Sequence, residues 1–544
     1  MVYSPTIRSK GKRNATRSTQ VAKVPAPING IDARNLLGGG SPQHCIYAYN
    51  LVPDETGVKV RKGYREWVIG LGSPVRTIIP FKAANPIDNR LFVATSTGIY
   101  DVTEYASTPV LMTDPVDWQL TGDDAGWGVF INYVSLNGDS YCFYADQING
   151  LFRYTGTGGL TGDWVRPTDI TGVSVENINF VAMHKIRIWF GVENDATAYY
   201  LPIDAIAGLA ESFEFGGKFK HGGALKGLYN WTVDGGIGVD DYLVAVSTSG
   251  DVIPYTGSDP SQSDWGMRGS YYIGKTAKGA RCASTQGGNL HLLSAYGLIS
   301  MSDLLRGVDP RLPDAQSISA KIAPFLREET DSLESNGWSV VNLPNAGVTA
   351  IVTPTRPNGQ DIEYIYNLAV DGWGLWRDVP INCIDSYGQY PYVGTADGRV
   401  LVMDVVKDNV LLNPVIGTEN GVNIQFSLMF SYSDLGAGGL FKRGMMARPD
   451  FISKGGVAVE AKFFYDYDTG EILTTAGDAK TVGYQWDVSN WDDSFWNSSI
   501  LSSTYTTQGA SGMGRSLSLA LKGNCLGDTI FASVDVFYNI GGGL

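Results

Sequence analysis

Hydrophobic and polar positions alternate in short runs along most of the chain, and turns that contain glycine separate these runs. Five segments share one arrangement, in which an apolar or alternating run is followed by a glycine turn and a second run. This pattern is typical of a β-hairpin. The five predicted hairpins are residues 91–102 (LFVATSTGIYDV), 140–154 (SYCFYADQINGLFRY), 242–255 (YLVAVSTSGDVIPY), 290–301 (LHLLSAYGLISM) and 390–403 (YPYVGTADGRVLVM).

The hairpins recur at a nearly constant spacing. Their turn glycines, Gly98, Gly150, Gly250, Gly297 and Gly398, are separated by 52, 100, 47 and 101 residues, so two gaps are double. Each double gap contains another pair of strand-like runs, at residues 187–203 (RIWFGVENDATAYYLPI) and 348–368 (VTAIVTPTRPNGQDIEYIYNL). Seven β units of about 50 residues predict a β-propeller, because a ring of blades buries faces that a single blade cannot. A run of unrelated hairpins in β-sandwiches is the alternative.

The length of the alternating runs changes after about residue 410. Longer alternating runs predict a separate antiparallel β domain; they are residues 425–432 (QFSLMFSY), 456–467 (GVAVEAKFFYDY), 516–521 (SLSLAL) and 529–538 (TIFASVDVFY). The predicted fold is therefore all-β, with a seven-bladed β-propeller-like domain, a C-terminal antiparallel β domain and an extended N-terminal arm. The predicted boundaries are 1–30 for a basic flexible arm, 31–70 for a segment packing on the body, 71–410 for the propeller and 411–544 for the C-terminal domain.

Helix signals are few. Residues 202–212 (PIDAIAGLAES) predict a helix, and residues 302–306 (SDLLR) a short helical turn. The glycine-rich stretch 215–228 (FGGKFKHGGALKGL) predicts an exposed loop. Together these features predict an insertion in the propeller near residues 202–230.

Charge is distributed unevenly. The chain has 544 residues and a formal net charge of −14, yet residues 1–24 hold six of its 41 bases and no acid, which leaves 35 bases against 55 acids. The arm is interpreted as a flexible tail, or as a segment that becomes ordered on an acidic partner or a neighbouring subunit. Its candidate contact residues are Lys10, Lys12, Arg13 and Arg17. The acidic body does not favour nucleic-acid binding.

The sequence offers few groups for catalysis. The four histidines have no metal-ligand spacing, and no nucleophile-elbow or phosphate-loop motif occurs. The five cysteines are scattered, and we expect them to be reduced and buried. No enzyme activity, catalytic residue, cofactor or metal is predicted. No apolar run reaches the roughly 20 residues of a transmembrane helix, and the N-terminus lacks a secretory signal. Three tryptophans, Trp486, Trp491 and Trp496, are candidate exposed aromatics.

One segment resembles a known family. Residues 48–65 (AYNLVPDETGVKVRKGYR) follow the form N-L-x-P-x-x-x-G-V-x-V-R-x-G-Y, which resembles the opening of the tail nozzle or DNA-stabilisation (tail hub) proteins of short-tailed bacteriophages, the podoviruses. Three later matches, the second made of two stretches, are similar to the same family in the same order. They are residues 250–265 (GDVIPYTGSDPSQSDW), 366–376 (YNLAVDGWGLW), 393–398 (VGTADG) and 442–451 (KRGMMARPDF).

Within the first motif, Val58 and Val60 are expected to share one strand face. Arg61 would then point the other way, toward a partner or solvent, and is a candidate contact residue.

The resemblance implies a structural virion protein that forms the tail nozzle, a ring-shaped conduit below the portal and adaptor that retains and then passes the genome. The implied partners are five further copies in a homo-hexameric ring, head-to-tail adaptor or portal proteins, tail fibres or a tail needle, and double-stranded DNA passing without sequence-specific contacts. The chain would fold in the host cytoplasm before assembly into the virion tail. A receptor- or glycan-binding virion protein is the alternative, and a propeller glycosidase is a third hypothesis.

Overall fold

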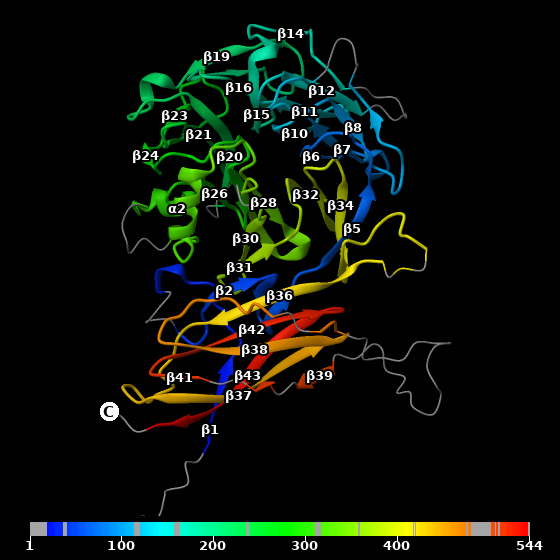
Figure 1. The fold of residues 1–544 in the computed structure, drawn as a ribbon. Coiled ribbons are helices and arrows are strands. Elements are labelled where there is room, and N and C mark those ends of the chain that lie inside the picture. Colours follow the sequence, from blue (N-terminus) through cyan, green and yellow to red (C-terminus); the bar gives the residue numbers. More distant parts are fainter. Residues whose placement is uncertain are drawn as a thin grey trace, which may run out of the picture.

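The structure is a computed structural model. It describes residues 19–35, 41–113, 120–156, 164–234, 239–310, 317–356, 359–416, 418, 420–474, 477–479, 502–505, 508–509 and 512–541. Two lobes make up the chain (Figure 1): a β-propeller, and below it in the view a lobe of long strands from both ends of the sequence. No helix in these ranges is long and apolar enough to cross a bilayer.

The propeller has six separate sheets among the described residues. The first three are β6 (Val75–Phe81), β7 (Arg90–Thr95), β8 (Ile99–Asp101) and β9 (Val110–Leu111); β10 (Gly128–Val134), β11 (Ser140–Asp146), β12 (Gly150–Gly156) and β13 (Trp164–Val165); and β15 (Ile178–His184), β16 (Arg187–Val192), β17 (Thr197–Tyr200) and β19 (Glu211–Glu214). The next two are β20 (Leu225–Asp234), β21 (Val239–Ser247), β22 (Asp251–Thr256), β23 (Gly266–Met267) and β24 (Tyr271–Tyr272); and β25 (Ala283–Gln286), β26 (Asn289–Ser294) and β27 (Gly297–Ser300).

A strand from before the propeller completes the sixth sheet. It contains β32 (Cys383–Tyr387), β33 (Tyr390–Gly394), β34 (Val400–Val405) and, beyond β34, the early strand β5 (Gly63–Val68). The antiparallel β5–β34 pairing closes the ring with chain segments more than 300 residues apart. Such closure removes the exposed strand edges that an open ring would leave.

A large mixed sheet joins the propeller to the second lobe. Its upper part is the antiparallel meander β28 (Ser339–Leu343), β29 (Val348–Val352), β30 (Ile362–Asn367) and β31 (Gly372–Arg377). β28 contacts both β25 and β32, so the meander stands between two propeller sheets. Leu375 of β31 pairs with β2 (Cys45–Tyr49) and with β3 (Leu51–Asp54), which carries the hydrogen-bonding across the junction.

The second lobe has two layers. One runs β2, β36 (Val422–Phe430), β42 (Leu517–Cys525) and β38 (Val457–Tyr465). In the other, β43 (Thr529–Ile540) pairs with β37 (Lys442–Ser453) along one edge and with β1 (Gln20–Pro25) and β4 (Gly57–Val60) along the opposite edge. β37 also pairs with β39 (Ser502–Tyr505), β40 (Gln508–Gly509) and β41 (Met513–Gly514). Aromatic contacts between the layers, such as Phe430 on Phe531, fill the core.

The remaining elements are short. They are the strands β14 (Ile170–Thr171), β18 (Gly208–Leu209) and β35 (Lys407–Asp408), the helices α1 (Met301–Leu305) and α2 (Ala323–Ser332), and the 3-10 turns η1 (Ala33–Asn35), η2 (Pro86–Asp88), η3 (Val175–Asn177), η4 (Gly216–Lys218) and η5 (Pro344–Ala346).

All seven predicted hairpins are confirmed, as β7–β8, β11–β12, β16–β17, β21–β22, β26–β27, β29–β30 and β33–β34. The four long C-terminal strands are confirmed as β36, β38, β42 and β43, and the short helix at 302–306 as α1. Helix α2 was not predicted.

Three local predictions are wrong in whole or in part. Residues 202–212 form turns, β18 and the start of β19 instead of a helix, because Asp204 and Gly208 take positive φ angles of 57° and 111°. The segment 215–228 is an exposed loop only in part: residues 215–224 form turns with Lys220 and His221 exposed, but Phe215 and Phe219 are buried in a propeller core and β20 begins at Leu225. The arm is not flexible up to residue 30, because residues 20–25 are strand β1 paired with β43.

A repeated cap explains the regular hairpins. Five hairpins have, at the end of their first strand or directly after it, a polar residue that is 0% exposed, three or four positions before the turn glycine. The Asp146 carboxylate accepts hydrogen bonds from the backbone N–H groups of Ile148 (3.1 Å) and Asn149 (2.9 Å), and the Thr395 hydroxyl accepts one from Arg399 N (2.9 Å). These side chains satisfy turn N–H groups that burial would otherwise leave unpaired. The five residues are Thr95, Asp146, Ser247, Ser294 and Thr395.

The turn glycines allow adjacent blades to pack closely. Gly250 has a φ of 95°, and a Cβ atom there would lie 1.9 Å from the carbonyl oxygen of Gly274, in the connection to the next blade. We expect Gly250→Ala to destabilise the fold by more than about 1 kcal/mol, because both the backbone angle and the contact are incompatible with a side chain. Gly266→Ala is the control, since its Cβ would meet nothing within 4 Å and its φ is not left-handed. Thermal unfolding midpoints measure the difference, and equal midpoints for the two variants would contradict this account.

Candidate functional site

The motif at residues 48–65 lies at the junction of the two lobes. Asn50 stands between β2 and β3 with a φ of 59° and connects three elements through its side chain. Its Nδ2 donates to the Gln425 carbonyl on β36 (2.8 Å), while its Oδ1 accepts from Arg377 N on β31 (2.9 Å) and from Arg61 Nε (2.9 Å). The side-chain amide of Asn50 therefore connects β36, β31 and Arg61, the residue that follows β4.

Arg61 makes a buried ion pair with Asp408 of β35. Nη1 donates to Oδ1 and Nη2 to Oδ2, both at 2.7 Å, in the bidentate geometry that guanidinium and carboxylate groups prefer. The two side chains are only 1% and 10% exposed. The pair joins residues that are 347 positions apart.

The expectation that Arg61 faces a partner or solvent is wrong for this chain. Val58 and Val60 are buried on one face of β4, as predicted, at 0% and 4% exposure. β4 ends at Val60, so the alternation of the strand does not extend to Arg61. Its side chain turns inward, where Asp408 and Asn50 satisfy it.

The next motif residues start the strand that closes the propeller. A Cβ atom on Gly63 would lie 2.1 Å from the Lys407 carbonyl oxygen, so the close approach of β5 to β35 requires glycine. The Tyr64 hydroxyl donates to Asn409 Oδ1 (2.8 Å). These contacts hold β5 beside the segment that leaves the propeller.

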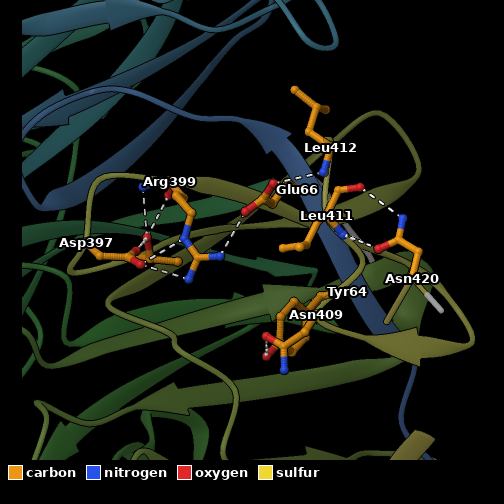
Figure 2. Close-up of polar contacts among 9 residues, drawn as sticks. Tyr64, Glu66, Asp397, Arg399, Asn409, Leu411, Leu412 and Asn420 are labelled. Carbon is orange, nitrogen blue, oxygen red and sulfur yellow. Dashed lines mark hydrogen bonds and ion pairs between the residues drawn. The ribbon is translucent and has the colours of Figure 1, made fainter. Parts of the chain in front are cut away.

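Figure 2 shows how this segment is fixed further along. The Glu66 carboxylate accepts from Arg399 Nη1 (3.0 Å) and from Leu412 N (2.9 Å). Arg399 also pairs with Asp397, while the Asn420 side chain exchanges hydrogen bonds with the backbone of Leu411 (Figure 2). Ring closure and the exit toward β36 therefore share one polar network.

A second ionisable group, Glu363 on β30, is buried near Arg61. It is 1% exposed, and neither carboxylate oxygen has a hydrogen-bond partner in the described part of the chain. Burial, and next the charge of Asp361, raise its pKa well above 4.5, while Arg356 and Arg61 oppose the shift. The folded chain therefore favours the neutral acid.

The propeller axis contains a cavity of about 450 Å³. Residues of β10, β15, β20, β25 and β28 line it, together with Asp385 of β32. Burial raises the pKa of Asp385 to about 6, against the opposing charges of Arg281 and Lys82. Arg281, just before β25, donates from Nη2 to the Arg76 carbonyl on β6 (3.0 Å), so one side chain connects two blades that are not neighbours.

The seven other predicted site residues are not among the described residues. They are Lys10, Lys12, Arg13 and Arg17 and the tryptophans Trp486, Trp491 and Trp496. The five cysteines are buried and unpaired, as expected. Within the described ranges, no group of three or more His, Cys, Asp or Glu residues is arranged to hold a metal ion.

Sequence reasoning missed Asp408, Glu363 and the role of Asn50. Asn50 belonged to the motif, and its side-chain amide can both donate and accept hydrogen bonds. That property could have suggested that Asn50 connects several segments. Asp408 gave no local signal, because its partner is 347 residues away.

Removing the Arg61 guanidinium should leave Asp408 as an unpaired buried charge. We expect Arg61→Met to lower the free energy of unfolding by about 3–5 kcal/mol, and the added change Asp408→Asn to recover part of that loss. The control is Arg306→Met, because Arg306 is 75% exposed and only 3.7 Å from Asp303; such surface pairs contribute about 0–1 kcal/mol. Denaturant titration compares them, and an equal loss in Arg61→Met and Arg306→Met would contradict the assignment.

The buried carboxyl of Glu363 should make stability fall as pH rises. Above about pH 4.5 the unfolded chain releases this proton while the folded chain retains it, so increasing pH favours unfolding. We expect Glu363→Gln to match the wild type near pH 4.5 and to be more stable at pH 8. Melting curves across this range measure the effect, with Glu55→Gln on the exposed β3–β4 turn as control. A constant offset between Glu363→Gln and wild type would contradict a buried neutral acid.

Comparison with known proteins gives no family. No protein-family model and no curated protein matches the chain. Among solved structures, Raptor from Chaetomium thermophilum is similar with a TM-score of 0.39 at 11% identity over 67% of this chain, which spans 29% of that chain. YCF48 bound to D1 peptide has a TM-score of 0.37 at 11% identity, over 65% of this chain and 97% of its own.

Proposed function

We propose that this chain is a structural subunit of the tail nozzle of a short-tailed bacteriophage, a ring-shaped conduit below the portal that retains and then passes the genome. The observation that carries this proposal is the junction. Asn50, Arg61, Gly63 and Tyr64 belong to the motif that resembles nozzle proteins, and all four fix the two lobes to each other. A motif devoted to joining lobes fits a building block better than a catalyst.

A fixed angle between the lobes suits ring assembly. A cyclic ring needs contacts between two different patches of each subunit, and it closes only when those patches keep a set orientation. Here three ties act together: the Arg61–Asp408 ion pair, the hydrogen bonds of Asn50 to the backbone of Gln425 and Arg377, and the network around Glu66. Each lobe can therefore supply one patch.

We further propose that the propeller has seven blades. The meander β28–β31 has four antiparallel strands and stands between the blade of β25–β27 and the blade of β32–β34. Its position matches the unit that the repeat places at residues 348–368. It would then be a blade whose last strand is shared with the second lobe through Leu375.

In this proposal the DNA conduit lies between subunits and not along the propeller axis. The axial cavity, at about 450 Å³, has the size of a small-molecule pocket, and Arg281 connects blades beside it. The net charge of −14 would let lumen-facing acids repel the DNA backbone, so that the genome slides. At physiological salt this repulsion acts over about 8 Å.

The partners follow from the same proposal. The chain would contact copies of itself in a homo-hexameric ring, adaptor or portal proteins above, tail fibres or a tail needle, and double-stranded DNA in passing. The basic residues Lys10, Lys12, Arg13 and Arg17 would favour an acidic partner or neighbouring subunit.

A glycan-binding virion protein is the second candidate, and one pocket favours it. Tyr47 and Tyr49 stack at 5.2 Å in a pocket of about 290 Å³ that Arg377, Glu471 and Lys522 also line. Aromatic faces beside charged hydrogen-bonding groups suit sugar rings. The glycosidase hypothesis calls for two or three converging carboxylates, whereas Asp385 is the one acidic residue among the described residues lining the axial cavity.

Electron microscopy of the purified protein and of its source particle tests the proposal. We expect six-membered rings with an open channel along the ring axis, located in the tail of the particle. Monomers or trimeric spikes in both samples would overturn the nozzle. Binding of such monomers or spikes to host polysaccharide, measured by calorimetry, would support the second candidate instead.

A further inference from the structure

The segment between β35 and β36 carries apolar side chains on the outside of the molecule. Residues 411–416 (LLNPVI), called the tongue below, contain no charged residue. Ile416 is 100% exposed, Val415 69% and Leu411 42%. In Figure 1 this yellow stretch projects sideways beyond β5 and β34. Apolar side chains that cluster on an exposed feature indicate an interaction surface.

Hydrogen bonds fix the base of the tongue. Leu412 N donates to the Glu66 carboxylate (2.9 Å), and the Asn420 side chain exchanges hydrogen bonds with the backbone of Leu411 at 2.8 and 3.0 Å (Figure 2). The tongue is therefore presented in one position before any partner binds. A segment that is already fixed loses little conformational entropy when it docks.

A groove of about 840 Å³ lies at the junction of the two lobes. Its deep part is apolar, since Trp376 and Met403 line it and are 4% and 3% exposed. Leu368 and Tyr390 also line it and are about half exposed. Other lining residues belong to the β3–β4 hairpin and to three turns, at residues 52–54, 59–62, 344–348, 367–369 and 389–391.

The charged residues that line the groove are balanced within the chain. Three of the five form ion pairs, which are Arg61–Asp408, Lys62–Asp528 and Asp404–Arg65. The other two, Asp54 and Lys59, have opposite charges and belong to the same hairpin. A charged occupant would therefore gain little and would lose its hydration. An uncharged apolar segment is the occupant that complements this groove, and the tongue is such a segment.

The tongue points away from the groove of its own chain. Val410, directly before the tongue, forms a parallel bridge with Arg65 on β5, and Leu412 then bonds to Glu66. The chain thus runs along β5 in the direction that leads away from residues 59–62, which line the groove. The tip of the tongue could enter this groove only if these bonds broke, whereas the groove of a second copy is open to it.

We propose that the tongue of one copy docks in the groove of a second copy, with Val415 and Ile416 against Leu368, Trp376 and Tyr390. The contact rests on the proposed nozzle function and deepens it, because tongue and groove are the two different patches that a cyclic ring requires. Each copy gives its tongue to one neighbour and receives a tongue from the other.

Cysteine crosslinking tests this contact. The five natural cysteines are buried, so a full-length chain with Ile416→Cys and Ala346→Cys has two accessible thiols, one on the tongue and one on the exposed lining of the groove. Oxidation should produce a ladder of linked chains, up to six in a hexameric ring. The control carries Ile87→Cys, on a turn where Ile87 is 82% exposed, in place of Ile416→Cys, and should give at most a tenth of the linked product.

The products separate this contact from the nozzle function. A ladder supports both. Linked dimers alone, in which each copy places its tongue in the groove of the other, support the docking and overturn the ring. Six-membered rings in electron microscopy without tongue–groove links, or with links within one chain, overturn the docking and leave the nozzle in place. Neither rings nor links between chains would overturn both.

A charge placed on the tongue gives a second measurement that needs no crosslink. Ile416→Asp should raise the dissociation constant of self-association at least tenfold, because the carboxylate would have to leave water and enter an apolar groove. The fold should be unaffected, since the Ile416 side chain is fully exposed within one chain. Ile87→Asp is the matched control. Analytical ultracentrifugation compares the variants, and equal dissociation constants for Ile416→Asp and wild type would overturn the proposal.

Discussion

A charged side chain that is removed from water needs a partner of opposite charge. The buried ion pair between Arg61 and Asp408 meets this requirement, and the arrangement of the two lobes depends on it. Both side chains are almost fully excluded from solvent, and the two groups come from opposite ends of the propeller sequence. Because neither could be buried alone, the end of β4 and the strand β35 must meet. Their meeting sets the place where β5 starts, and so the place where the ring closes.

Ring closure then determines the rest of the propeller. β5 must lie beside β34 in register, and the close approach of Gly63 to Lys407 and the hydrogen bond from Tyr64 to Asn409 fix that register at one end. Glu66 fixes it further along through Arg399 and Leu412 N (Figure 2). Once both ends are joined, every blade must fit the remaining arc, and glycines such as Gly250 permit the close contact between neighbours that this fit requires.

Local sequence patterns predicted the local structure. Contacts between residues that are far apart in the sequence could not be predicted from such patterns. The hairpins were predictable because the alternating runs and the glycine turn between them lie within about 15 residues. The helix at 202–212 failed because composition does not reveal the left-handed angles at Asp204 and Gly208. Of the candidate site residues only Arg61 can be placed, and its inward turn depends on Asp408, which no local pattern connects to it. An ion pair between residues more than 300 positions apart is seen only once the chain is folded, so the sequence pattern around Arg61 could not predict it.

Polar groups at the junction do what apolar contacts cannot. Burying hydrocarbon at this place would stabilise the contact about as well, since replacing a buried ion pair by apolar residues is often neutral. Apolar packing, however, has no direction and would allow the lobes to slide. The bidentate geometry of Arg61 and the three hydrogen bonds of Asn50 permit one arrangement only.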